Sequence, residues 1–143
     1  MTTRLHVTPP GIRLAPLAEI ADGAARGFRL EFAGGRFDGF VVRRGADAIG
    51  YVDRCPHAGV PLAARADGYQ VYPVSDGLLV ACTWHGALFR AEDGFCVAGP
   101  CAQQRLAAWP VAVRRGTIVT ARAAPGFWQR VFRARFTQMR ARP

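Results

Sequence analysis

Short apolar segments separated by glycine turns fill the first third of the chain. Residues 27–32, 39–43 and 48–54 are rich in Phe, Val, Ile and Tyr, and single or paired glycines lie between them. Turn signals spaced about eight to twelve residues apart are typical of an antiparallel sheet. Further strands are predicted at residues 78–82, 88–91, 95–97, 111–114 and 117–122. The pattern predicts an all-β fold.

Three segments depart from this alternation before the C-terminal end. Residues 1–10 form a polar lead-in that ends in proline, so we expect little order there, with His6 exposed to solvent. Residues 12–20 predict a short edge strand interrupted by Pro16 and followed by a turn. Residues 63–77 are the longest irregular stretch, and they are either a specific docking surface or a tolerated surface loop.

The hydrophobic period changes to that of a helix after residue 126. One face carries the apolar residues Trp128, Val131, Phe132, Phe136 and Met139, and arginines lie opposite. We expect a basic amphipathic helix over residues 124–143, distinct from a domain over residues 1–123. Such a helix either packs on the sheet with its arginines outward, docks to an acidic partner, or contacts a membrane surface or nucleic acid.

Composition and charge narrow the class of protein. The chain has 143 residues, half of them apolar, which is enough for one domain with a real core. The formal net charge is +9, and the last 23 residues hold six arginines and no acidic residue. The chain shows neither an apolar leader nor a run of 18 apolar residues, so we expect a cytoplasmic protein without a membrane span.

Two short motifs carry the chemistry. Cys55-Pro56-His57 and Cys82-Thr83-Trp84-His85-Gly86 together supply two thiolates and two imidazoles. A single zinc ion accepts such a set, but ligands only two residues apart strain a tetrahedral knuckle. A two-iron cluster suits the spacing better, with Cys55 and Cys82 on one iron and His57 and His85 on the other.

The residues around these motifs identify a family. Residues 55–62 and 82–90, followed by Gly94 and Gly99-Pro100, resemble the cluster-binding signature of the Rieske ferredoxin family. The resemblance covers about residues 27–122. It implies a Rieske-type antiparallel β-sandwich with a cluster-binding loop subdomain, one [2Fe–2S] cluster per chain, and a third loop at Gly99-Pro100 that shields the cluster.

The resemblance also implies a function. Members of the family pass single electrons through histidine ligands that lie toward the surface. We therefore expect a soluble ferredoxin that carries electrons between a reductase and a terminal oxygenase or other oxidoreductase. Rieske oxygenases add a mononuclear iron held by two histidines and a carboxylate, and only His6 would remain for that site. The alternative is a zinc- or cluster-stabilised interaction module, or a redox-sensing accessory module, whose basic tail binds an acidic partner.

Four further residues near the motifs bear on the redox properties. High-potential Rieske proteins carry a serine and a tyrosine whose hydroxyls bond to cluster sulfurs, and this chain has Ala87 and Phe89 there. The resemblance thus implies a reduction potential near the bottom of the Rieske range, about −150 to −50 mV. Cys96 and Cys101 flank the third loop. They are a regulatory disulfide, part of a second metal site, or small buried hydrophobic residues.

Overall fold

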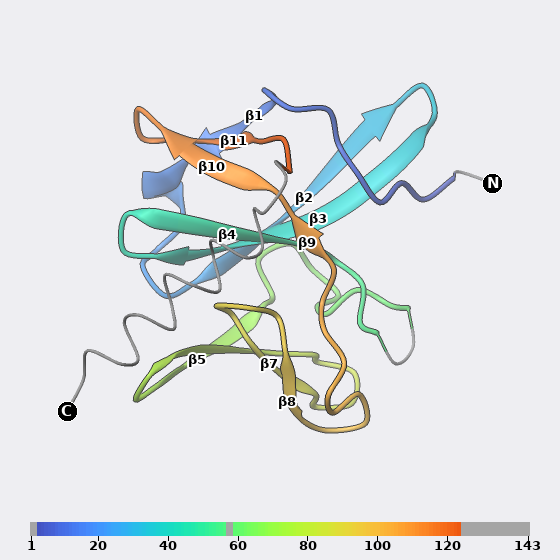
Figure 1. Cartoon of the computed structure of the whole chain (residues 1–143), viewed down its shortest axis with the longest axis vertical. Helices are drawn as coiled ribbons and strands as arrows, with labels where there is room; N and C mark the ends of the chain where they lie inside the picture. The colour runs from blue at the N-terminus through green and yellow to red at the C-terminus, as the bar shows by residue number, and fades with distance from the viewer. Residues whose placement is uncertain (1–2, 57–58, 124–143) are drawn as a thin grey trace.

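The computed structural model describes residues 3–56 and 59–123, and antiparallel β-sheets dominate this part of the chain. Three sheets follow one another along the long axis of Figure 1. Their strand orders are β1-β11-β10, β2-β3-β4-β9 and β5-β6-β7-β8. The all-β prediction is confirmed.

The middle sheet separates two hydrophobic cores. It consists of β2 (Ala25–Phe32), β3 (Gly35–Arg44), β4 (Asp47–Val52) and β9 (Ala108–Trp109). Successive side chains of a strand point to opposite faces. On β3, Phe37 and Val41 therefore enter one core while Phe40 and Val42 enter the other, and all four are fully buried. Both faces of this sheet are thus covered.

The first core lies between the middle sheet and the sheet formed by the two ends of the domain. That second sheet contains β1 (Arg13–Pro16), β10 (Val111–Arg114) and β11 (Thr117–Thr120), and the 3-10 helix η1 (Leu17–Glu19) follows β1. Trp109 fills the centre, with its ring 4.8 Å from that of Phe37. Position 39 must be glycine, because a Cβ there would lie 2.5 Å from the indole of Trp109.

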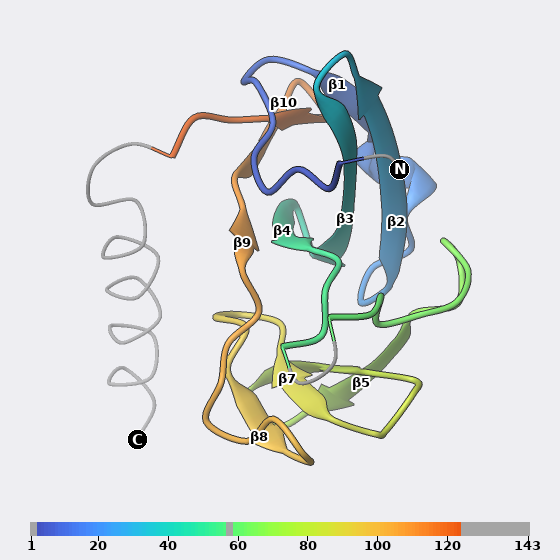
Figure 2. The same cartoon turned by 90° about the vertical axis from the view of Figure 1, so that its right-hand side faces the viewer.

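The second core supports the sheet at one end of the molecule (Figure 2). This sheet contains β5 (Gln70–Val74), β6 (Gly77–Ala81), β7 (Leu88–Arg90) and β8 (Cys96–Ala98). Two side chains tie it to the middle sheet. The buried hydroxyl of Tyr51 donates to the carbonyl of Ala91 at 2.6 Å, and Arg44 of β3 pairs with Glu92 at 3.2 Å.

Most strands lie where the hydrophobic pattern predicts them, including the β7–β8 hairpin, but residues 63–77 differ. The pattern indicates an irregular stretch, and the structure has β5 within it, paired with β6. The prediction was wrong because four of the five β5 residues are exposed, so no buried alternation marks the strand. The short strand β9 and the helix η1 were also not predicted.

The N-terminal segment is ordered, contrary to the expectation from its composition. Leu5 N donates to the carbonyl of Arg36, and Arg36 N donates to the carbonyl of Thr3, both at 2.8 Å. The hydroxyl of Thr8 accepts a hydrogen bond from the Trp109 indole at 2.9 Å. Backbone pairing and this indole contact therefore hold a segment that has little apolar surface. His6 is exposed, as expected.

Two predictions fall on residues that the structure does not describe. These are the amphipathic helix over residues 124–143, with the domain boundary before it, and the ligand role of His57. No helix among residues 3–56 and 59–123 combines the length and apolar character that a bilayer crossing requires.

Tyr51→Phe is expected to lower the free energy of unfolding by about 1–3 kcal/mol, because it leaves the buried carbonyl of Ala91 without this donor. Urea denaturation of both proteins measures the difference. Tyr72→Phe is the matched control, since the Tyr72 hydroxyl bonds to Gln70 on the exposed face, and its effect should be close to zero. Equal losses in the two variants would contradict a bridging role for Tyr51.

Candidate metal centre

The first cysteine loop begins where β4 ends. Cys55 N donates to the carbonyl of Val60, and Gly59 N donates back to the carbonyl of Cys55, both at 2.7 Å. Gly59 has a φ of +67°, in the left-handed region that favours glycine. These two hydrogen bonds close a compact loop that starts at the cysteine. His57 belongs to this loop in sequence and lies outside the described residues.

The second cysteine loop, between β6 and β7, closes in the same way. Cys82 N donates to the carbonyl of Ala87 at 2.8 Å, and Gly86 N donates to the carbonyl of Cys82 at 2.9 Å. Gly86 has a φ of +74°. In both loops a glycine four residues after the cysteine makes the turn. The sequence Cys-x-x-x-Gly therefore encodes the same backbone closure twice.

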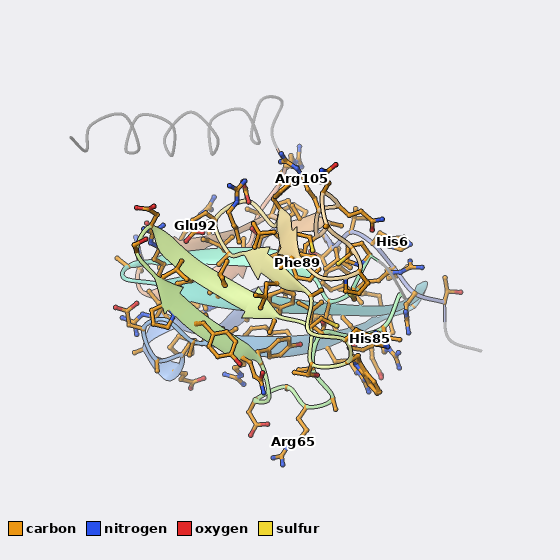
Figure 3. The ribbon with its side chains drawn as sticks, turned by 90° about the horizontal axis from the view of Figure 1, so that it is seen from below. His6, Arg65, His85, Phe89, Glu92 and Arg105 are labelled. Atoms are coloured by element: carbon orange, nitrogen blue, oxygen red, sulfur yellow. The ribbon has the colours of Figure 1, made fainter. Side chains whose placement is uncertain are left out.

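The candidate ligands of the two loops differ in exposure. Cys55 and Cys82 are 0% exposed and belong to one buried cluster of side chains. His85 and the neighbouring Trp84 are exposed. Figure 3 looks onto the β5–β8 end and shows His85 at the periphery, with Glu92 toward the opposite side. The structure thus brings the two cysteines together in the interior and leaves this imidazole in contact with solvent.

A chain of polar contacts joins the two loops. The carbonyl of Leu62, just after the first loop, accepts hydrogen bonds from Thr83 N at 2.8 Å and from Thr83 Oγ1 at 2.9 Å. Leu62 N donates to Asp53 Oδ1 at 2.8 Å, and the Tyr69 hydroxyl donates to Asp53 Oδ2 at 2.5 Å. The bridging roles of Asp53, Tyr69 and Thr83 could not be predicted from the sequence, because their partners lie 9 to 21 residues away.

Burial dominates the titration of this polar chain. Desolvation raises the pKa of Asp53 above its ordinary value, and the hydrogen bonds from Tyr69 and Leu62 N oppose that rise. Desolvation and the neighbouring Asp53 carboxylate raise the pKa of Tyr69, so its hydroxyl stays protonated and remains a donor. In this pair the neutral Tyr69 hydroxyl is the donor, and the Asp53 carboxylate is an acceptor whose ionised form is destabilised by burial.

The N-terminal segment and the third loop also reach the cysteine loops. The Arg4 guanidinium donates to the carbonyl of Gly59 at 2.9 Å. Gly99 has a φ of +100°, and a Cβ on it would lie 2.7 Å from the Cα of Ala87, so the third loop packs directly on the second. The N-terminal segment thus contacts the first cysteine loop, and the third loop contacts the second. The sequence had indicated the role of Gly99 but not that of Arg4.

Cys96 and Cys101 lie next to the candidate ligands. All four cysteines of the chain are thiols, so the structure does not contain the disulfide that the sequence left open. The Sγ atoms of Cys96 and Cys101 are 3.3 Å apart. Burial, with hydrogen bonding to Cys96 and Cys55, raises the pKa of the Cys101 thiol to about 12.

The donor set suits an iron–sulfur cluster. Thiolate and imidazole are the ligands of such centres, and two buried thiols on adjoining loops provide the sulfur half of the set. Within the described residues, no three Cys, His, Asp or Glu side chains gather as a site for a metal ion. His57, which would complete the donor set, is not among the residues searched.

Comparisons with known proteins point to the same kind of cofactor. The family model described as the Rieske [2Fe-2S] domain matches residues 14–116. A search of curated proteins gives no match. Among solved structures, the ferredoxin of carbazole 1,9a-dioxygenase from Nocardioides aromaticivorans IC177 is similar at 24% identity, with a TM-score of 0.59, over 80% of this chain and 98% of that chain.

Two other kinds of protein share the fold. A putative NADH-dependent nitrite reductase small subunit from Mycobacterium tuberculosis aligns at 18% identity and a TM-score of 0.59, covering 82% of this chain and 99% of that one. The terminal oxygenase of carbazole 1,9a-dioxygenase from Novosphingobium sp. KA1 aligns at 21% identity and a TM-score of 0.58, covering 84% of this chain and 30% of that one. At these identities the likeness shows the fold.

Tyr69→Phe is expected to raise the pKa of Asp53 further, because the hydrogen bond from Tyr69 lowers it. That bond favours the ionised carboxyl, so its removal should cost about 1.5–3 kcal/mol of unfolding free energy at neutral pH. The loss should shrink as the pH falls through the folded pKa toward the ordinary value of 3.8, where the carboxyl is protonated in both proteins.

Denaturation at a series of pH values measures this dependence, and a ¹³C-detected titration of Asp53 gives its pKa directly. Tyr51→Phe is the control, because it removes a buried hydroxyl whose acceptor is a carbonyl that does not titrate. A loss in Tyr69→Phe that is independent of pH would contradict the role assigned to Asp53.

Proposed function

The chain belongs to the Rieske [2Fe-2S] domain family, and from that premise we propose that it is a ferredoxin. It carries single electrons between a reductase and a terminal oxygenase or another oxidoreductase. The observation that carries the proposal is a pair of cysteine loops that are closed by the same backbone hydrogen bonds. The cysteines of both loops are buried in one group of hydrophobic side chains. Bound there, a [2Fe–2S] cluster supplies a one-electron redox couple.

Four residues hold the cluster in this proposal. Cys55 and Cys82 bind one iron, and His57 and His85 bind the other. Burial of both cysteines supports the first assignment, because sulfur ligands in the interior are kept from solvent and oxidants. Exposure of His85 supports the second, because an imidazole at the surface lets a docked protein approach the redox centre.

In this proposal the protein contributes to electron transfer by holding the cluster ligands in fixed positions. Thr83 and Leu62 fix the distance between the two loops, and Asp53 and Tyr69 fix Leu62. A ligand set that moves little on reduction lowers the reorganisation required for each electron. Exposed Trp84 beside His85 offers an apolar contact for the partner at the same place.

The proposed partners are proteins. The chain has three histidines, two of which the cluster takes, so a mononuclear iron site with two histidines has no ligands left beside His6. Ferredoxin in complex with its oxygenase is found among structures of the same fold, at 23% identity and a TM-score of 0.57. We infer that this chain also delivers its electron to a separate enzyme.

The first test is the composition and spectrum of the centre. The purified protein is expected to hold two irons and two sulfides per chain, and His85→Cys is expected to abolish the Rieske electron paramagnetic resonance signal, since thiolate donates more charge than imidazole. His6→Cys is the matched control and should keep the wild-type signal, because His6 is exposed and outside the ligand set. Stoichiometric zinc without iron in the wild type would favour the interaction module instead.

The second test concerns the basic tail. Residues 121–143 carry six arginines and no acidic residue, so Arg130→Gln with Arg133→Gln is expected to weaken binding to the electron-transfer partner several-fold, most strongly at low salt. Arg114→Gln with Arg115→Gln removes the same charge from the exposed β10–β11 turn and is the control. Equal weakening by both pairs would indicate attraction by net charge without a docking role for the tail.

A further inference from the structure

Cys96 and Cys101 lie beside a proposed ligand without belonging to the ligand set. Cys96 is 1% exposed and Cys101 is 0% exposed, and both share a buried cluster with Cys55. The Cys101 side chain is hydrogen bonded to those of Cys96 and Cys55. It therefore contacts the sulfur proposed to bind iron.

The backbone of the third loop fixes Cys101 in this place. Cys96 N donates to the carbonyl of Gln104 at 2.8 Å, and Gln104 N donates to the carbonyl of Cys101 at 3.0 Å. Gln103 N donates to the carbonyl of Cys96 at 3.1 Å. Gly99 packs against the second cysteine loop. The residue that contacts Cys55 therefore lies in a loop that is held by its own backbone hydrogen bonds and packs on the second cysteine loop.

The proton of each thiol can be assigned from these contacts. Cys96 Sγ donates to the carbonyl of Ala98 at 3.2 Å. The Cys101 proton then has two sulfur acceptors, Cys96 Sγ and Cys55 Sγ. A sulfur that binds metal is a thiolate, and an ionised acceptor makes a stronger hydrogen bond than a neutral thiol. The Cys101 proton is therefore directed to Cys55 when Cys55 binds iron.

We propose that Cys101 is a positioning residue of the redox centre, whose thiol donates a hydrogen bond to the Cys55 sulfur and raises the reduction potential. The inference rests on the proposed function, because it takes Cys55 as an iron ligand. Reduction adds negative charge that the ligand sulfurs share, and hydrogen bonds to sulfur stabilise it. Ala87 and Phe89 are fully buried and have no hydroxyl to offer, so the third loop supplies a donor in their place.

The experiment compares Cys101→Ala with Cys96→Ala, which remove the same atoms from neighbouring buried positions. Voltammetry of the loaded proteins, kept anaerobic with thiols reduced, is expected to show a lower potential for Cys101→Ala. The equilibrium constant for reduction should fall about tenfold, which is about 59 mV for one electron. Cys96→Ala should change it by less than a third as much on the mV scale. Cys101→Ser, which keeps a donor, should lie nearer the wild type than Cys101→Ala does.

A vibrational measurement identifies the proton itself. Exchange into D₂O should shift the iron–cysteine stretching band in the resonance Raman spectra of the wild type and of Cys96→Ala. The band of Cys101→Ala or Cys101→Ser should respond differently from both, because the thiol deuteron is gone.

The outcomes separate the two claims. Equal potentials in Cys101→Ala and the wild type, or equal shifts in the two alanine variants, would overturn the role of Cys101. If Cys101→Ala assembles no cluster, the test uses Cys101→Ser. The role of Cys101 would then be overturned if D₂O shifts the iron–cysteine stretching band of Cys101→Ser by the same amount as that of the wild type. A wild type that lacks the [2Fe–2S] absorption would refute the proposed function itself.

Discussion

Hydrogen bonds to one backbone oxygen link the two cysteine loops, and the proposed metal centre depends on that link. The carbonyl of Leu62 accepts two hydrogen bonds from Thr83. The amide of Leu62 donates to the Asp53 carboxylate, which also accepts a hydrogen bond from the Tyr69 hydroxyl. A cluster that takes ligands from two loops requires a fixed distance between them. Here hydrogen bonds provide it and all four cysteines remain thiols. Such a link persists in a reducing compartment, where a disulfide would not.

The middle sheet anchors the cysteine loops to the rest of the domain. Strand β3 buries side chains in both cores, so the sheet cannot shift toward one core without opening a void in the other. Two side chains of the middle sheet reach the β5–β8 sheet: Tyr51 donates a hydrogen bond to the carbonyl of Ala91, and Arg44 forms an ion pair with Glu92. The end of the molecule that carries the cysteines is therefore anchored on a layer with little freedom of its own.

Local features could be predicted from the sequence, and long-range ones could not. The glycines that close the cysteine loops and the turn of the β7–β8 hairpin are local, because one residue type at one position decides the backbone there. Strand β5 gave no signal because it is mostly exposed, and the N-terminal segment is held by bonds to residues more than 30 positions away. Asp53 was predicted near the end of a strand, and its partner Tyr69 in an irregular stretch. Only the fold brings them together.

The matching closure of the two cysteine loops has a consequence for how the centre assembles. Each loop is shaped by hydrogen bonds within about six residues of chain, before any contact with the other loop is needed. Closing so short a segment costs little entropy compared with joining distant ones. In the proposed site, Cys55 and Cys82 thus begin turns that are closed by the chain itself, and the conformational entropy of closing these turns is lost when the chain folds. Binding energy of incoming irons and sulfides would then go into affinity and not into closing these turns.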